Sequence, residues 1–115
     1  MTLKKYYTYM LRCTDNSIYT GITNDFNKRM NEHFHAAKEG AKYTKSHTPQ
    51  KVIAAWESAD KSSASKLEYH IKKLAKKEKE SLALGAPLKD YLEEKMDTTQ
   101  YERIKLEEVV EGKYL

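Results

Sequence analysis

Two β-favouring stretches on either side of a short turn sequence constrain the fold of this chain more than any other feature. Residues 6–13 and residues 18–23 are rich in tyrosine, threonine and isoleucine, a composition that is typical of strands. Residues 14–17, Thr-Asp-Asn-Ser, have the composition of a turn. The sequence therefore predicts a β-hairpin close to the start of the chain.

The length of the connection decides which side chains of the hairpin share a face. With an even number of residues in the connection, Tyr9 and Tyr19 would lie on opposite faces of the hairpin, because successive side chains of a strand alternate between the two faces. A three-residue loop over residues 15–17, with Thr14 paired to Ile18, puts both tyrosines on one face. We expect an odd loop of this kind.

A helix is predicted directly after the hairpin. Asn24 and Asp25 are suitable N-cap residues, and Gly40 is a suitable stop. Between them, apolar side chains recur at helical spacing at Phe26, Met30 and Ala37. Residues 41–49 then form a polar, basic loop.

The remaining chain predicts one more strand and at least two helices. Residues 52–56 are a short apolar run with the length of a third strand. The next helix is capped by Asp60, Ser62 or Ser63, bends among residues 76–80 and ends by Gly85. Its apolar stripe consists of Ala64, Leu67, Ile71, Leu74 and Ala75. A further helix is expected to begin at Pro87, with an apolar face of Leu88, Tyr91, Leu92 and Met96. Beyond Asp97 the apolar residues follow neither the helical nor the strand period. This stretch is therefore compatible with a strand, a short helix or a partly ordered tail.

Length and charge indicate one domain with an acidic extension. A chain of 115 residues suits a single domain, which we assign to residues 1–85, with residues 86–115 as an extension that is not an independent domain. Residues 1–83 hold 16 Lys and Arg against 9 Asp and Glu, whereas residues 84–115 hold 5 against 8. A basic first part is an expected feature of a nucleic-acid-binding protein, although many basic proteins have no such role.

The cysteine, the histidines and the hydropathy exclude several classes. A single Cys excludes an intrachain disulfide, and Cys13, within a strand, is interpreted as a small buried side chain. The four histidines do not combine with Cys13 in zinc-finger spacing. No apolar run approaches the roughly 20 residues of a membrane span. We therefore expect a cytoplasmic protein.

Three polar residues lie on or beside the apolar faces of the predicted helices. His33 falls between Met30 and Ala37, and Arg29 lies at the edge of the same face. Taken singly, such a His is usually a hydrogen-bonded core residue and such an Arg a surface residue. Glu68 lies similarly on the second long helix, where a carboxylate needs a partner or a cation.

Glu68 has an alternative explanation. Ser65-Lys66-Leu67-Glu68 has the form of a capping box that opens a helix. Earlier caps are present at Asp60, Ser62 and Ser63, which favours the inward carboxylate.

The strand tyrosines indicate a functional site only in combination with these polar residues. Singly, each strand tyrosine is most simply a packing residue; the four are Tyr6, Tyr7, Tyr9 and Tyr19. Two tyrosines with an arginine, a histidine and a carboxylate on one sheet face would supply a base, a phosphate clamp, a hydrogen-bond orienter and a metal ligand. We expect these groups, including Glu68, to point to the same face.

These motifs, in this order, resemble the GIY-YIG nuclease superfamily. The matching segments are Tyr7-Thr8-Tyr9, Tyr19-Thr20-Gly21, Arg29-Met30-Asn31-Glu32-His33, and Glu68 within residues 66–74. The resemblance covers roughly residues 5–83. It is closest to the small stand-alone bacterial branch of UPF0213 type, related to Slx-type nuclease domains, through residues 19–25 and Ala41-Lys42-Tyr43-Thr44.

The resemblance implies an α/β (α+β) fold with a small three-stranded antiparallel sheet flanked by helices. It also implies hydrolysis of phosphodiester bonds in DNA, on single-stranded or branched substrates, with Mg²⁺ or Mn²⁺. By matching position, the motif tyrosines are Tyr9 and Tyr19, and Arg29 stabilises the phosphate. His33 partners a tyrosine, and Glu68 binds the metal.

Further residues are expected to contact nucleic acid. Tyr43 lies in the loop matched by the resemblance, and the remaining candidates are lysines; the whole set is Lys28, Lys42, Tyr43, Lys45, Lys72, Lys76 and Lys77. The lysines at 72–77 are equally explained as a solvated helix edge, and otherwise track phosphates.

Two alternative functions stay open. Many GIY-YIG members carry an Asn late in the domain, and this chain has none after Asn31. A catalytically weak nucleic-acid-binding module is therefore one alternative. The other is a scaffold whose acidic extension binds a DNA-repair protein.

Overall fold

The hairpin forms with an odd loop, but its register differs from the expected one. The computed structural model describes residues 5–38 and 48–106. Strands β1 (Tyr6–Cys13) and β2 (Ile18–Thr23) are antiparallel. Arg12 pairs with Ile18, so the loop is residues 14–16 and the pairing of Thr14 with Ile18 was wrong. The shift is two residues in total, which preserves which side chains share a face.

Asn16 is the reason for this loop. Its φ of 69° is left-handed, a conformation that Asn tolerates better than most residues. The Asn16 amide donates to the Cys13 carbonyl at 2.9 Å, and the Cys13 amide donates to the Ser17 carbonyl at 2.9 Å. These bonds close a three-residue loop whose last residue is left-handed, as in common three-residue hairpin loops with a bulge.

Within the described residues, the sheet has four strands rather than the expected three. Its order is β2-β1-β3-β4, with β3 at Pro49–Ser58 and β4 at Glu102–Arg103. The fourth strand arises because the C-terminal segment returns to the sheet and pairs Arg103 with Trp56. β2 is consequently one edge of the sheet.

Strand β3 is longer than the apolar run that predicted it, and it is irregular. Its pairing with β1 shifts between Met10 and Leu11 and again between Arg12 and Cys13. The first shift lets Val52 and Ala55 pack on one face although they are an odd number of residues apart. The central strands β1 and β3 are covered on both faces, which explains why no simple alternation was visible in residues 52–56.

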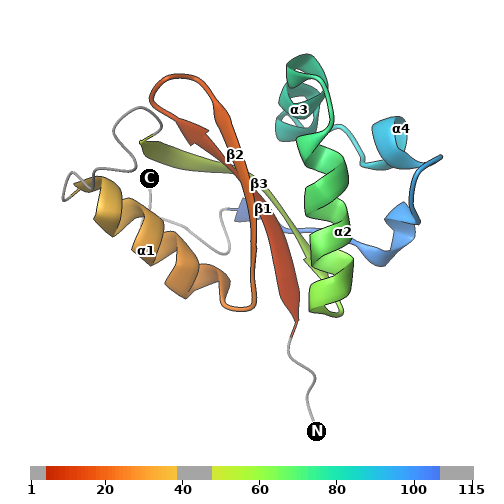
Figure 1. The fold of residues 1–115 in the computed structure, drawn as a ribbon, viewed down its shortest axis with the longest axis horizontal. Helices are drawn as coiled ribbons and strands as arrows, with labels where there is room; N and C mark the ends of the chain where they lie inside the picture. The colour runs from red at the N-terminus through yellow and green to blue at the C-terminus, as the bar shows by residue number, and fades with distance from the viewer. Residues whose placement is uncertain (1–4, 39–47, 107–115) are drawn as a thin grey trace, which may run out of the picture.

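The helices cover opposite faces of the sheet (Figure 1). Helix α1 (Phe26–Lys38) covers the face of Tyr9 and Leu11, which pack with Phe26, Met30, Val52 and Ala55. Helix α2 (Lys61–Lys72) covers the other face, where Leu67 and Ile71 pack with Met10 and Trp56. The Thr8 hydroxyl on that face donates to the Ala64 carbonyl at 3.0 Å.

Helices α2 and α3 are separated earlier than expected. Asp60 caps α2 by accepting the Ser63 amide at 2.8 Å. α2 ends at Lys72 and α3 spans Lys76–Ala83, so the break lies at residues 73–75 rather than 76–80. Gly85, with φ of 115°, ends α3 as the sequence indicated. The Ala86 amide donates to the Ser81 carbonyl at 3.0 Å, as in a Schellman motif.

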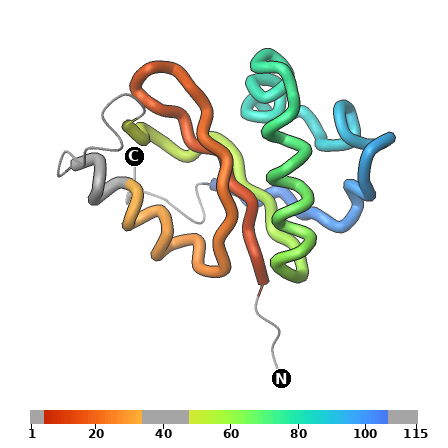
Figure 2. Tube along the Cα trace, in the orientation of Figure 1, coloured from red at the N-terminus to blue at the C-terminus, as the bar shows by residue number. Residues whose placement is uncertain are grey.

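The C-terminal segment is less helical than expected and is built into the core. Helix α4 spans only Lys89–Leu92, and the 3₁₀ helix η2 (Thr98–Gln100) leads to β4. The side chains of Leu88, Leu92 and Met96 nevertheless join the Met10 cluster. In the tube view the part of the segment that precedes β4 lies beyond α2 from the sheet, and the chain then returns to the sheet at β4 (Figure 2). The expected apolar face therefore exists without a long helix.

Cys13 is 2% exposed, which confirms that it is a buried residue. Burial raises the pKa of its thiol. In the part of the chain that the structure describes, no helix has the length and apolar character needed to cross a membrane.

Leu92→Ala is expected to lower the free energy of unfolding by about 2–5 kcal/mol, because it leaves a cavity at a fully buried position. Urea denaturation measures the change. Leu84→Ala is the matched control, since Leu84 is 90% exposed and its loss should change stability by no more than about 0.5 kcal/mol. Equal effects of the two substitutions would show that the C-terminal segment is not part of the core.

Candidate active site

The two motif tyrosines share one face of the hairpin, as predicted. Tyr9 pairs with Gly21, and Leu11 pairs with Tyr19, so all four residues belong to the α1 face. The rings of Tyr9 and Tyr19 have centroids 6.2 Å apart. Tyr9 is fully buried, whereas Tyr19 on the edge strand is 43% exposed. The pair thus connects the core with the surface.

Helix α1 brings Arg29 and His33 to the hydroxyl of Tyr9. The Tyr9 oxygen lies 2.9 Å from Nε2 of His33 and accepts Nε–H of Arg29 at 3.4 Å. One helical turn separates the two residues, so both reach the same atom. The His33 ring also lies 5.5 Å from that of Tyr19, centroid to centroid. The structure therefore brings together Tyr9, Tyr19, Arg29 and His33.

Burial and hydrogen bonding fix the charges in this group. Burial raises the pKa of Tyr9 to about 12. Burial, helped by the nearby Arg29 cation, lowers the pKa of His33 to about 4. The hydrogen bond to Tyr9 raises the pKa of Arg29 further. At neutral pH the group holds a protonated Tyr9, a neutral His33 and a cationic Arg29.

These charges determine the direction of the hydrogen bonds. Arg29 can only donate, so the Tyr9 oxygen accepts from it. The Tyr9 proton is then available to Nε2 of the neutral His33. In this arrangement His33 carries its own proton on Nδ1.

Gly21, matched above only as part of the Tyr19-Thr20-Gly21 motif, has a packing role at the candidate site that sequence reasoning missed. A Cβ on Gly21 would lie 2.6 Å from the Tyr9 hydroxyl oxygen and 3.0 Å from Cε2 of Tyr19. Only a glycine lets both rings lie across this point of the sheet. The available signal was a glycine two residues after Tyr19, which places it on the same face as that tyrosine.

Glu68 approaches from the other side of the sheet, so the expectation of a single shared face was wrong for this residue. α2 packs on the Met10 face, opposite α1. The capping-box alternative is also wrong, because Asp60 is the cap and Ser65 lies within the helix. The Glu68 carboxylate is 24% exposed and lies 3.2 Å from Nζ of Lys72.

The course of α2 places Glu68 along the edge strand. Lys61, at the start of α2, lines a cavity with Ile22 and Thr23 at the end of β2. Lys76, beyond the end of α2, donates to the carbonyl of Asn16, which precedes β2. These two contacts lie at opposite ends of β2, so α2 runs antiparallel to β2.

Glu68 is seven residues after Lys61, on the same stripe of the helix and about 10 Å further along its axis. That rise equals about three strand residues. We infer that Glu68 lies beside the middle of β2, near the level of Tyr19. The candidate site then extends across the edge strand, with Glu68 on one side and Arg29 on the other.

A cavity of about 530 Å³ continues from Arg29 around the end of β2. Its cationic side chains are Lys28, Arg29 and Lys61, and its acidic ones are Asp25 and Glu32. Glu32 lies 3.2 Å from Nη1 of Arg29. Lys28 is thus beside the candidate site, and so is Lys61, which was not among the residues predicted from the sequence.

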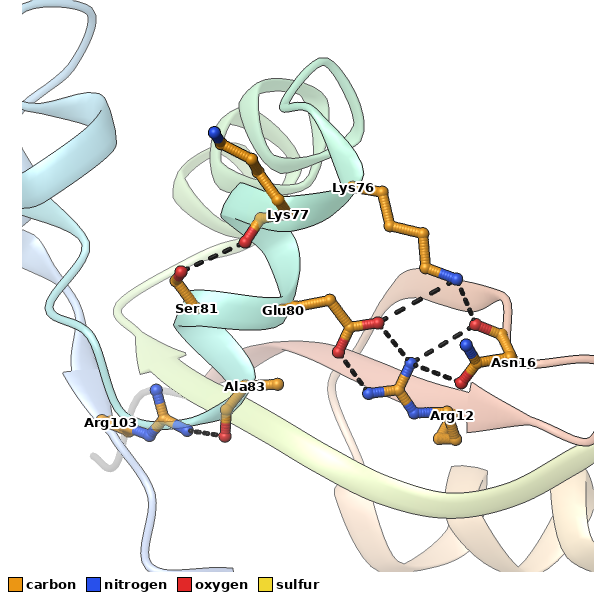
Figure 3. A network of polar contacts seen from close by, with 8 residues as sticks. All are labelled: Arg12, Asn16, Lys76, Lys77, Glu80, Ser81, Ala83 and Arg103. Carbon is orange, nitrogen blue, oxygen red and sulfur yellow. Dashed lines mark hydrogen bonds and ion pairs between the residues drawn. The ribbon is translucent and has the colours of Figure 1, made fainter.

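The other predicted nucleic-acid contacts differ in availability. Lys76 donates to Asn16 and lies 4.0 Å from Glu80, which also forms a bidentate pair with Arg12 (Figure 3). Lys77 points away from this network (Figure 3). Lys72 pairs with Glu68. Lys42, Tyr43 and Lys45 lie outside the described residues.

A divalent metal is compatible with a single protein carboxylate. Among residues 5–38 and 48–106, no group of three or more His, Cys, Asp or Glu could hold a metal ion. Mg²⁺, however, commonly binds one or two carboxylates together with substrate phosphates and keeps several waters. Lys72 is 55% exposed, and an exposed helical pair of this spacing contributes only about 0.3–0.5 kcal/mol. The pair with Lys72 is therefore too weak to exclude a cation at Glu68.

The family assignment agrees with this geometry. Residues 5–81 match the family model of the GIY-YIG catalytic domain. The chain therefore belongs to the GIY-YIG family, whose catalytic domain indicates a nuclease-type hydrolase.

Within this family the chain is similar to UPF0213 proteins. UPF0213 protein FN1575 of Fusobacterium nucleatum is 51% identical over 77 residues, which are 67% of this chain and 75% of that protein. UPF0213 protein YsiG of Lactococcus lactis is 35% identical over 105 residues, 90% of this chain and 99% of that protein. The solution NMR structure of UPF0213 protein BH0048 from Bacillus halodurans is 35% identical, with a TM-score of 0.46. The match covers 81% of this chain and 99% of the BH0048 chain.

His33 is expected to titrate near pH 4 instead of near 6.5, because burial and Arg29 disfavour its cation. The unfolded chain takes up this proton near pH 6.5 and the folded chain only near pH 4. The contribution of His33 to the free energy of unfolding should thus be complete above about pH 6.5 and decrease as the pH falls toward 4. Histidine ring signals in NMR spectra measure the midpoint.

His33→Gln identifies the signal of His33 by its loss and should remove this part of the pH dependence of stability. A midpoint near 6.5 would contradict the buried, neutral state of His33.

Proposed function

We propose that this protein is an endonuclease that hydrolyses phosphodiester bonds in DNA with the help of Mg²⁺ or Mn²⁺. The observation that carries the proposal is the Tyr9 hydroxyl, bound by both Arg29 and His33 beside the exposed ring of Tyr19. A structural core would not need a cation, a neutral imidazole and two phenols at one point of its surface. Phosphoryl transfer can use a cation to stabilise the phosphate and a phenol or an imidazole as a proton acceptor.

Arg29 is the candidate for stabilising the transition state. Its guanidinium is held by Tyr9 and Glu32, so its position is defined before a substrate binds. Negative charge on the phosphate oxygens increases as the attacking oxygen approaches phosphorus. A cation already in place stabilises that charge without reorganisation.

The two tyrosines differ in their suitability as a base. Tyr9 is buried, is engaged on both sides of its oxygen and has a pKa of about 12. Tyr19 is 43% exposed and lies on the edge strand of the sheet. We assign Tyr19 as the base and Tyr9 as the residue that positions Arg29 and His33.

In the proposed reaction a water oxygen forms a bond to phosphorus while its proton passes to the Tyr19 oxygen, which acts as a phenolate and becomes a phenol. The bond from phosphorus to the leaving sugar oxygen breaks on the opposite side, and that oxygen takes a proton from solvent. Glu68 would hold the divalent metal, which as a Lewis acid neutralises charge on the leaving oxygen. Lys28 and Lys61, in the cavity beside Arg29, would contact the neighbouring phosphates.

Arg29→Ala and Glu68→Ala are each expected to lower the cleavage rate by about 10²-fold or more, because each removes a group that stabilises charge in the transition state. Cleavage of labelled single-stranded, nicked, flapped and four-way DNA in Mg²⁺ measures the loss. Glu94→Gln is the control, since it removes an exposed carboxylate of the C-terminal segment.

Chelation of the metal with EDTA should abolish cleavage by the wild-type protein. A wild type that binds DNA and does not cut it in Mg²⁺ would favour the nucleic-acid-binding module instead. Faster cleavage of RNA than of DNA would show that RNA is the preferred substrate.

Tyr19→Phe is expected to lower the cleavage rate and leave DNA affinity nearly unchanged, because it removes only the hydroxyl of an exposed ring. Single-turnover rates and binding isotherms separate the two quantities. A Tyr19→Phe protein that cleaves at the wild-type rate would exclude Tyr19 as the base.

A further inference from the structure

The outer face of α2 presents an exposed aromatic ring between lysines. We define this face by the residues opposite the buried stripe of the helix, which are Ser62, Lys66, Tyr69 and Lys73. Tyr69 is 56% exposed, one of few large hydrophobic side chains to be so open among the residues described. It contributes nothing to the core beneath, which is formed by Ala64, Leu67 and Ile71. Its ring lies 5.2 Å from that of His70, centroid to centroid, in an edge arrangement, and its exposed part is available to a ligand.

The surroundings of Tyr69 favour a polyanion that also offers flat rings. Nζ of Lys73 lies 5.0 Å from the centroid of the Tyr69 ring, and Lys66 is one turn before it. A nucleobase can replace the ammonium on the ring, and the ammonium then moves to the adjacent phosphate. Aromatic rings flanked by cations bind single strands in this way, and a duplex keeps its base faces stacked internally.

Charge along the helix supports the same occupant. Residues 61–73 contain four lysines and one carboxylate, Glu68, which already pairs with Lys72. An acidic peptide would satisfy the lysines but leave the Tyr69 ring without a partner. Unpaired nucleotides satisfy both.

The outer face adjoins the candidate site. Tyr69 follows Glu68 directly, and one residue is a rotation of about 100°, or roughly 10 Å around the surface of a helix. A strand that passes Glu68 therefore continues onto this face.

We propose that the outer face of α2 binds the unpaired nucleotides that flank the phosphodiester at the candidate site. Tyr69 stacks on one base, and Lys66 and Lys73 contact phosphates. The position of the cleaved bond rests on the proposed function, whereas binding itself does not. The substrate class is then DNA with a single-stranded segment.

The test is fluorescence anisotropy with fluorescein-labelled oligothymidylate and with a duplex of the same length, in EDTA so that no cleavage occurs. Tyr69→Ala is expected to weaken binding of the single strand about 5- to 100-fold, as for the loss of one stacked base. Tyr69→Phe keeps the ring and should bind within about 2-fold of the wild type. Duplex binding should not change in either variant.

Lysine variants test the phosphate contacts. Lys73→Gln should reduce the slope of log K against log salt by about 0.7 for the single strand. Lys89→Gln, at an exposed lysine of α4, is the matched control and should leave the slope unchanged.

Photocrosslinking gives a second measurement on the wild-type protein. An oligonucleotide with 5-iodouracil should form its adduct at Tyr69. Adducts confined to other residues, an unchanged affinity of Tyr69→Ala, or equal losses for single strand and duplex would each overturn the proposal.

The assay also separates this proposal from the nuclease function. Arg29→Ala should lose cleavage and keep Tyr69-dependent binding. If the wild type binds single strands through Tyr69 and cuts no DNA, the proposed nuclease function is overturned and the proposed binding surface on α2 is supported. If the wild type cuts DNA and its binding does not depend on Tyr69, the nuclease function is supported and the binding surface is overturned.

Discussion

The burial of Tyr9 determines how the rest of the candidate site is arranged. Its ring packs in the core of the α1 face, and its hydroxyl is the meeting point of Arg29 and His33. Because the ring is fully buried, the hydroxyl has one position, and helix α1 must dock with both polar side chains turned toward it. Gly21 completes this constraint by leaving room for the ring. The packing of the core therefore also positions the polar groups of the candidate site.

The edge position of β2 explains how groups from opposite faces of a sheet can belong to one site. A central strand would separate α1 from α2 completely. An edge strand leaves its outer side open, so side chains from both helices reach the same solvent region. Lys61 shows that this happens, since it belongs to α2 and lines the same cavity as Arg29 of α1. Tyr19 lies on that strand and is the exposed member of the tyrosine pair.

Sequence reasoning found those features that depend on local patterns. The hairpin, the first helix, the end at Gly85 and the buried Cys13 follow from composition and spacing over a few residues. The loop register depended on which residue adopts a left-handed conformation, and Asn16 was one of several choices. The fourth strand depends on residues 102–103 meeting β3 across half the chain, and a two-residue strand has no pattern of its own. The face of Glu68 was missed because an apolar stripe shows that a helix packs, and not on which side of the sheet.

The acidic extension illustrates how charge and packing can disagree. Its sequence separates it from the basic part of the chain, yet Leu88, Leu92 and Met96 complete the core under α2. Arg103 strengthens the connection, since it lies over the Trp56 ring at 5.4 Å and donates to the carbonyl of Leu82 at 2.6 Å. The Tyr101 hydroxyl also donates to the Ser63 carbonyl of α2 at 2.6 Å. Removing the extension to expose a more basic surface would remove the support of α2, the helix that carries Glu68 and Tyr69. The electrostatic role of this segment is therefore best studied by changing its exposed carboxylates one at a time, with the core side chains kept.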